Sequence, residues 1–187
     1  MSKGKLFVIS GASGVGKSTV LSKVMEARND LKFSVSATTR DPRPGEIDGV
    51  SYYFVTKERF EEMIRQDAFL EYDAHMDNYY GTPEQQVDEK LENSSVILDI
   101  DVNGAFNVRK KRADAVLIFI APPSLEELEH RLRGRGDTSE EQMQLRLERA
   151  RWETEQAKQY DHIVTNDRVE ACAEEILHII AMKCGEE

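Results

Sequence analysis

The residues Gly11-Ala12-Ser13-Gly14-Val15-Gly16-Lys17-Ser18 form the pattern G-x-x-x-x-G-K-[ST], which is typical of a phosphate-binding loop. This loop follows an apolar run at residues 6–9 and leads into a helix-like segment that begins at Thr19. Its glycines let successive backbone N–H groups curl around a polyphosphate, and the helix adds the positive end of its dipole. We predict that the loop binds a nucleotide polyphosphate, with Lys17 on its β- and γ-phosphates and the Ser18 hydroxyl on Mg²⁺.

The composition is that of one acidic globular domain. The chain has 187 residues, a hydrophobic content of 40% and a formal net charge of −10. This charge argues against a general nucleic-acid binder, which normally carries a basic stripe. No apolar run approaches the roughly 18 residues that a membrane span requires, and the N-terminus has no signal-peptide pattern. We therefore expect a cytoplasmic protein that binds neither nucleic acid nor membrane.

The cysteines and histidines give no sign of a crosslink or a transition-metal site. Cys172 and Cys184 fall in one predicted C-terminal helix, which would place them roughly 18 Å apart and beyond disulfide reach. The four histidines are scattered without the spacing of metal ligands. We expect no disulfide and no transition-metal centre.

The order of the predicted elements indicates an α/β fold. Continuous apolar runs at residues 5–10, 96–101 and 115–121 are typical of strands buried on both faces of a parallel sheet, with helices on either side. Two segments depart from this alternation: residues 34–84 are rich in strands, and residues 126–156 are helical and rich in arginine. The prediction is a phosphate-loop core domain with two insertions, the core comprising residues 1–33, 85–125 and 157–187.

The first insertion begins with a predicted strand at residues 33–38, where apolar and hydroxyl side chains alternate. Arg40 and Arg43 follow in a proline-stiffened loop, and a second short strand is predicted at residues 50–55. Fixed arginines beside hydroxyl groups suit a phosphate monoester, although the alternation alone is equally typical of a solvated strand face.

Glu71 lies in a predicted strand at residues 69–74, among mostly apolar neighbours. An unpaired carboxylate there would be costly, so we expect a donor-rich partner for it. Residues 78–81 read as a loop, and Thr82 begins a capping box with proline at the first helical position. For Thr82, helix capping and ligand contact are both open.

Asp99 and Asp101 end the buried run at residues 96–101. Apolar positions that lead to an aspartate are the usual form of the second NTPase motif, whose carboxylate holds Mg²⁺ or its water shell. Arginines then gather in the second insertion, where two glycines follow Arg131 and two arginines lie one turn apart at positions 146 and 149. They indicate either a salt-bridged helix surface or a mobile segment that swings its charges over a ligand.

These motifs, taken in order, resemble guanylate kinase, a family of nucleoside monophosphate kinases, over residues 5–182. The runs that carry the resemblance are the loop at 11–18, Ser-Ala-Thr-Thr-Arg-Asp-Pro-Arg-Pro-Gly-Glu at 36–46, Asn-Tyr-Tyr-Gly-Thr at 78–82, Ile-Leu-Asp-Ile-Asp at 97–101, Ala-Pro-Pro-Ser at 121–124 and Arg-Leu-Arg-Gly-Arg-Gly at 131–136. The resemblance implies that ATP and GMP, and also dGMP as acceptor, react with Mg²⁺ bound. It also implies a GMP-binding domain at 34–84 and a lid at 126–156.

The resemblance also implies a role for individual residues. ATP would contact the loop at 11–18 with Thr19, and Asn166 would approach adenine. Guanine would contact Ser36, Glu71 and Thr82, with Asp99 and Asp101 nearby, and Asp99 would also organise the Mg²⁺. The GMP phosphate would contact Arg40, Arg43, Tyr52 and Tyr80. Catalysis would rest on Lys17, Arg40, Arg131, Arg135 and Arg146 around the transferring phosphoryl group.

The chemistry of the residues agrees with this reading. Guanine presents adjacent N1–H and N2–H donors that one carboxylate such as Glu71 can accept together, while Ser36 can donate to O6. A phosphate acceptor is already anionic at neutral pH and needs no general base. Three alternatives are weighed: a GTPase, because Asp101-Val102-Asn103-Gly104 fits D-x-x-G; a non-catalytic binding module; and a kinase with another phosphorylated acceptor. The protein is expected to be a monomer or a homodimer.

Overall fold

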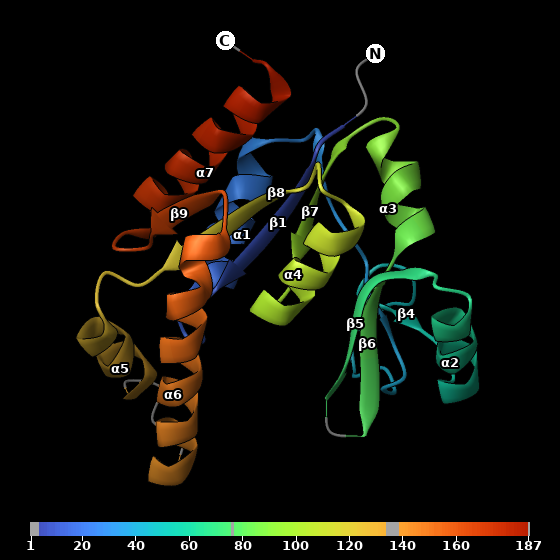
Figure 1. Ribbon diagram of the computed structural model, residues 1–187, viewed down its shortest axis with the longest axis horizontal. Coiled ribbons are helices and arrows are strands. Elements are labelled where there is room, and N and C mark those ends of the chain that lie inside the picture. Colours follow the sequence, from blue (N-terminus) through green and yellow to red (C-terminus); the bar gives the residue numbers. More distant parts are fainter. Residues whose placement is uncertain (1–3, 76, 134–138, 187) are drawn as a thin grey trace.

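The structure is a computed structural model that describes residues 4–75, 77–133 and 139–186 (Figure 1). Within them, a five-stranded parallel sheet has the strand order β2-β7-β1-β8-β9. Its strands are β1 (Leu6–Gly11), β2 (Leu31–Phe33), β7 (Ser95–Asp99), β8 (Val116–Ala121) and β9 (His162–Thr165). The predicted α/β fold class is confirmed.

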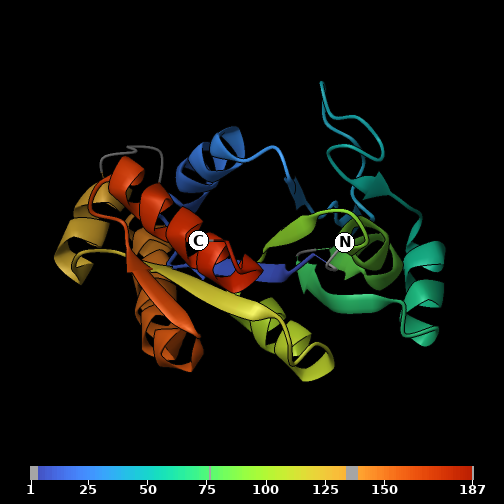
Figure 2. The same cartoon turned by 90° about the horizontal axis from the view of Figure 1, so that it is seen from above.

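Helices flank this sheet because its central strands are apolar on both faces. Figure 2 shows α1 and α7 on one face and α4 on the other. The helices around the sheet are α1 (Lys17–Ala27), α3 (Glu84–Leu91), α4 (Val102–Lys111), α5 (Leu125–Arg133), α6 (Glu140–Gln156) and α7 (Val169–Cys184), and a 3₁₀ turn spans Ala157–Gln159. The side of α7 that packs on the core carries Ala173, Ile176 and Ile180, which are buried, and Val169, which is partly buried.

A second, smaller sheet forms from one continuous stretch of the chain. Its strands are β3 (Ala37–Thr38), β4 (Tyr53–Phe54), β5 (Phe69–His75) and β6 (Asn78–Pro83), in the order β4-β3-β6-β5, and α2 (Lys57–Arg65) covers it. Its core is small: Phe60 of α2 stacks on Phe69, with ring centroids 4.4 Å apart, and on Tyr79 at 5.2 Å. Figure 1 shows this sheet and the helix pair α5–α6 extending in the same direction from the core, α5 and α6 at the left and the β5–β6 hairpin at the right.

Two predicted strands are corrected. The strand predicted at residues 33–38 is wrong, because β2 ends at Phe33 in the large sheet and β3 begins at Ala37 in the small one. The alternating pattern cannot reveal that the chain changes sheets in between. The strand predicted at residues 50–55 shrinks to β4, because the preceding residues turn, with the Ser51 N–H donating to the Ile47 carbonyl at 2.8 Å.

The loop predicted at residues 78–81 is also wrong, since these residues form β6, antiparallel to β5. Adjacent tyrosines favour a strand, and here they outweigh the flanking asparagine and glycine. The predicted capping role of Thr82 fails as well: Thr82 lies in β6, and Pro83 is the N-cap of α3 without a side-chain bond. The Thr82 side chain points instead across the hairpin to Glu71.

The remaining chain-level predictions concern the cysteines and the membrane. Cys172 and Cys184 are both free thiols on α7, and burial raises the pKa of Cys172 to about 11. Across the part of the chain that the structure describes, no helix combines the length and the apolar character needed to cross a bilayer.

Candidate functional site

The phosphate loop runs from the end of β1 into the first turn of α1, as predicted. Gly16 is the N-cap of α1 and has a φ of 93°, a left-handed conformation that glycine adopts without strain. The Thr19 N–H, in the first turn of α1, already donates to the Gly16 carbonyl at 3.1 Å, which leaves the N–H groups of Lys17 and Ser18 available at the loop. Gly11 to Ser18, together with Asp99, line a cavity of about 330 Å³.

Asp99 reaches this cavity because of the sheet register. β7 pairs in parallel with β1, and Asp99 is the partner of Ile9, so its carboxylate emerges beside the loop at the carboxyl edge of the sheet. There it forms an ion pair with the Lys17 ammonium group. Burial lowers the pKa of Lys17 to about 8, although the negative charges of Asp101 and Glu153 oppose this shift. Lys17 is therefore charged at neutral pH and titrates just above it.

The loop cavity also offers ligands for a divalent cation. The Ser18 hydroxyl is exposed at the start of α1, and the Asp99 carboxylate lines the same cavity. Hydroxyl and carboxylate oxygens are hard ligands of the kind that Mg²⁺ prefers. The residues present therefore fit a magnesium ion carried in with a nucleotide.

A second cavity, of about 390 Å³, lies between the two sheets. It brings together six of the predicted site residues: Ser36, Tyr52, Glu71, Tyr80, Asp99 and Asp101. The other residues of its lining are Asp73, Gly81, Ile100 and Arg149. Asp99 lines both cavities, so the two sites share one wall.

Glu71 has the partner that its buried position required. The Thr82 hydroxyl, opposite it across the β5–β6 hairpin, donates to Glu71 Oε1 at 2.5 Å. Burial raises the pKa of Glu71 to about 7, and the Thr82 hydrogen bond opposes that shift. A Cβ on Gly104, at the start of α4, would come within 3.1 Å of Glu71 Oε2, so a larger residue there would have to displace the carboxylate by a few tenths of an ångström. A donor-rich ligand edge would favour the ionised form of this carboxylate.

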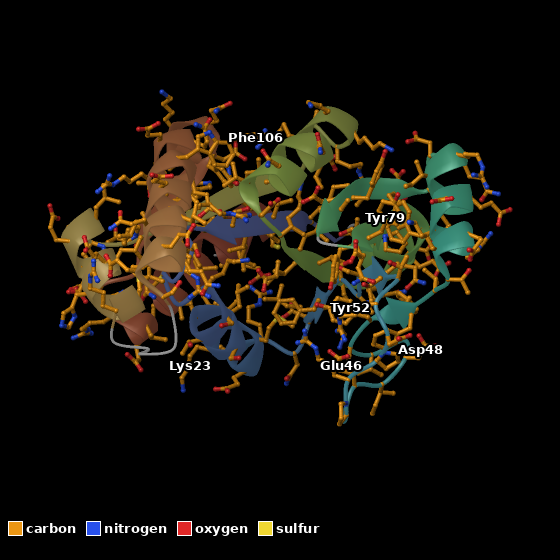
Figure 3. All side chains as sticks on the ribbon, turned by 90° about the horizontal axis from the view of Figure 1, so that it is seen from below. Lys23, Glu46, Asp48, Tyr52, Tyr79 and Phe106 are labelled. Carbon is orange, nitrogen blue, oxygen red and sulfur yellow. The ribbon has the colours of Figure 1, made fainter. Side chains whose placement is uncertain are left out.

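Arg40 and Arg43 lie on the loop between β3 and β4, next to the second cavity and not among the residues that line it. Both Glu46 oxygens accept from the Arg40 guanidinium, at 2.8 and 3.0 Å, and Glu46 Oε2 also accepts from the Arg43 N–H at 2.7 Å. The Arg40 guanidinium lies 5.6 Å from the ring centre of Tyr52, which lines the cavity. Figure 3 shows Glu46 and Tyr52 on the side of the small sheet where this loop lies, and Tyr79 on the side where α2 lies.

The remaining predicted residues are placed as follows. Arg131 pairs with Glu127 on α5 at 2.8 Å and donates to the Asn166 carbonyl at 2.9 Å. Asn166 is buried, and its side-chain amide donates to the Val15 carbonyl of the loop at 2.7 Å. Arg146 is exposed on α6 and does not line the second cavity. Thr19 is exposed in the first turn of α1, and Arg135 lies outside the described residues.

Asp101 has a structural role that the motif did not predict. Its Oδ1 caps α4 by accepting the Gly104 N–H at 2.8 Å, and its Oδ2 lies 3.3 Å from the Arg149 guanidinium. The D-x-x-G pattern that suggested a GTPase is thus accounted for by a helix cap. Sequence reasoning missed Glu46 and Glu153 and gave Arg149 no role. For Glu153 a signal exists, because it continues the buried stripe of α6 and lies four residues after an arginine.

Comparisons with known proteins agree on one family. A family model described as guanylate kinase matches residues 3–183. The chain is 48% identical to guanylate kinase of Oceanobacillus iheyensis, over 95% of this chain and 87% of the relative. It is 50% identical to guanylate kinase of Lactococcus lactis, with the same coverage. The crystal structure of guanylate kinase from Anaplasma phagocytophilum is similar with a TM-score of 0.74 and 33% identity, over 97% of this chain and 87% of that chain.

Proposed function

We propose roles for the two cavities from one premise: this chain belongs to the guanylate kinase family. It is an ATP:GMP phosphotransferase, which transfers the γ-phosphoryl group of ATP to GMP and gives ADP and GDP. In our proposal the loop cavity holds the ATP phosphates and the second cavity holds GMP. The observation that carries this proposal is the shared wall at Asp99, because direct transfer needs the two phosphates to meet at one place.

On the donor side, the loop N–H groups and Lys17 hold the β- and γ-phosphates. Lys17 is charged and close to the shared wall, so it can follow the phosphoryl group during transfer. Thr19 lies beside the loop, and Asn166 supports the loop through the Val15 carbonyl and approaches the adenine. A magnesium ion held through Ser18 and Asp99 would neutralise the charge of the phosphate oxygens.

On the acceptor side, Glu71 reads the guanine base. Its ionised carboxylate accepts the N1–H and N2–H groups together, while Thr82 orients it and Ser36 donates to O6. Adenine presents the opposite pattern on this edge and leaves Glu71 without a donor pair. Selection for guanine then follows from the cost of leaving a buried carboxylate unpaired.

The GMP phosphate is held in the same cavity, at the end away from the base and from Glu71. Arg40 and Arg43 offer guanidinium groups from a loop that Glu46 organises, and Tyr52 and Tyr80 lie beside them. The phosphate oxygen attacks without a general base, because its second pKa is about 6. Catalysis is then a matter of positioning and charge stabilisation, to which Lys17, Arg40, Arg131, Arg135 and Arg146 contribute.

The substrate assignment is tested with purified protein and Mg-ATP by following ADP release with GMP, dGMP, AMP, CMP or UMP. We expect rapid turnover with GMP and dGMP alone, and a loss of turnover of about 10³-fold or more in Lys17→Ala, since this lysine stabilises the transferring charge. Wild-type turnover in Lys17→Ala, or equal use of AMP, would contradict the proposed site.

Larger-scale features are part of the same proposal. We assign residues 34–84 to a GMP-binding domain and residues 126–156 to a lid, on a core of residues 1–33, 85–125 and 157–187. Closure of both over the substrates would exclude water, which otherwise competes as acceptor. The protein acts as a monomer or a homodimer on small nucleotides, without nucleic acid.

A further inference from the structure

Glu153 is a buried carboxylate on α6 that belongs to neither cavity. Glu153 is 4% exposed, although the other buried residues of α6 are apolar or small. We propose that Glu153 is a positioning residue that fixes the phosphate loop and Arg149 relative to each other, and so aligns the donor and acceptor cavities before transfer. This inference rests on the roles proposed above for the two cavities.

The first contact of Glu153 is with the loop itself. The Ser13 N–H donates to Glu153 Oε2 at 2.8 Å, although the two residues are 140 positions apart in the chain. This bond occupies one loop N–H group with a protein carboxylate. The Val15 N–H donates to the Ala12 carbonyl at 3.0 Å, so the N–H groups of Gly14, Gly16 and Lys17 are left for phosphate. The bond to Glu153 therefore holds the loop to α6 independently of any nucleotide.

The second contact leads to the acceptor cavity. Glu153 Oε1 accepts from Arg149 Nε at 3.0 Å, and the other end of that guanidinium lies 3.3 Å from Asp101 Oδ2. Arg149 and Asp101 both line the acceptor cavity. An unbroken series of hydrogen bonds thus runs from Ser13 in the donor loop, through Glu153 and Arg149, to Asp101.

A carboxylate at this position makes the free energy of folding less favourable. The buried face of α6 carries Met143, Leu147 and Ala150, and an apolar residue at position 153 would continue it. A buried carboxylate destabilises the fold unless it is paired, and its ion-pair partner Arg149 has a side chain that is 54% exposed. An exposed partner recovers little of that cost, so stability alone does not explain the choice of glutamate.

Alignment does explain it, given the chemistry of phosphoryl transfer. The protein supplies positioning and charge, and a displacement of about 1 Å can cost on the order of 10²-fold in rate. Glu153 sets the loop against a guanidinium that faces the acceptor cavity, and both of its oxygens are used in doing so. Its charge also favours the protonated form of Lys17, whose pKa burial lowers.

The test compares Glu153→Gln, Glu153→Ala, Arg149→Gln and the double variant Glu153→Gln/Arg149→Gln in the full chain. Glutamine still accepts the Ser13 N–H but cannot pair with a guanidinium, so we expect kcat to fall about 10-fold with the KM for ATP nearly unchanged. Alanine releases the loop as well and should lower kcat about 100-fold and raise the KM for ATP. The double variant should be no slower than the slower single variant, because both changes break the same link.

Two controls accompany these variants. Glu148→Gln removes the same charge from an exposed position on the same helix and should leave kcat and both KM values within about 2-fold of wild type. Trp152 is the only tryptophan of the chain and adjoins Glu153, so its fluorescence reports nucleotide binding and the folded fraction in each variant. Rates are expressed per folded molecule.

The outcomes separate this inference from the site assignment. Wild-type kcat in folded Glu153→Gln and Glu153→Ala would overturn the positioning role, and so would effects of Glu153→Gln and Arg149→Gln that simply multiply. Either result leaves the site assignment intact as long as Lys17→Ala is inactive. An active Lys17→Ala would instead contradict the site itself.

Discussion

At the scale of single residues, the Glu71 carboxylate combines a proposed role in recognition with an unusual titration. It is buried, it accepts from the Thr82 hydroxyl, and its pKa is raised to about 7. A raised pKa means that the carboxyl group is protonated below pH 7 and ionised above it. Since the proposed contact with guanine needs both oxygens as acceptors, GMP should bind more tightly as the pH rises through 7.

We therefore predict that the ionisation of Glu71 contributes a pH dependence of its own to GMP affinity. At pH 6 about one carboxyl in ten is ionised, so the Kd for GMP should be about 10-fold higher than its value well above pH 7. Calorimetric titrations between pH 5.5 and 8.5 would measure this change. The GMP phosphate also titrates in this range, so Glu71→Gln, which cannot ionise, serves as the reference. Parallel profiles for the two proteins would contradict the role of Glu71.

The predictability of the site from the sequence also differs residue by residue. Ser36, Tyr80, Asp99 and Asp101 lie in the quoted motif runs, Glu71 is singled out as a carboxylate in an apolar strand, and Tyr52 is named only through the family resemblance. The second cavity brings all six together. Glu46 lies in the run at 36–46, only three and six residues from its partners Arg43 and Arg40, but the run gives it no role of its own. Glu153 is missed because its contact with Ser13 is set by the tertiary fold and forms only after α6 packs beside the loop. Such contacts leave almost no trace in local spacing.

At the scale of elements, the loop between β3 and β4 depends on Glu46. This carboxylate accepts from the Arg40 guanidinium and from the Arg43 N–H, and these contacts hold the pKa of Glu46 below its usual range. The two proposed phosphate-binding arginines are thus placed by one acidic residue. A loop organised in this way presents its charges without first having to be ordered by the ligand.

We predict that Glu46→Gln raises the KM for GMP by about 10-fold while the KM for ATP stays near its wild-type value. The expected size follows from the loss of a charge-assisted hydrogen bond, which the amide replaces only in part. Steady-state kinetics with each substrate varied would measure it. Asp41→Asn is the matched control, because it removes a charge from the same loop but keeps the carbonyl that accepts from Arg40. An equal rise in both variants would mean that only net charge matters.

Strands were predictable from the sequence where both of their faces are buried. β1, β7 and β8 were located from continuous apolar runs, since both of their faces are buried in the sheet. Prediction failed for β3 and β6, in the small sheet. β3 has two residues, and β6 pairs through Tyr79 and Tyr80 with a strand that the sequence did not connect to it. Two residues carry too little pattern for β3 to be assigned alone, and the asparagine and glycine of β6 are residues that strands usually lack.

At the scale of the whole molecule, the two sheets have cores of unequal size. The large sheet and its helices share one extensive cluster of buried side chains. The small sheet and α2 share a separate cluster. Within the described chain, its fully buried hydrophobic residues are Ala37, Phe60 and Phe69. Local stability follows the amount of buried apolar surface, so the small sheet should open more often than the core.

We predict that backbone amides of β5 and β6 exchange with deuterium faster than those of β1 and β8, and that GMP slows exchange selectively in β5 and β6. The reason is that GMP adds contacts to the less stable sheet. Hydrogen-exchange mass spectrometry with and without GMP would show this, and ATP alone should protect the loop and α1 instead. Uniform protection across both sheets would contradict the prediction.

The small sheet is also continuous in the chain. β2 ends at Phe33, every strand of the small sheet lies between Ala37 and Pro83, and α3 begins at Glu84, so the main chain leaves the large sheet once and returns once. Most of the lining of the proposed acceptor cavity therefore comes from a single uninterrupted segment of the chain. Exchange of that segment by recombination would give a descendant a new phosphate acceptor while the ATP-binding half is passed on unchanged.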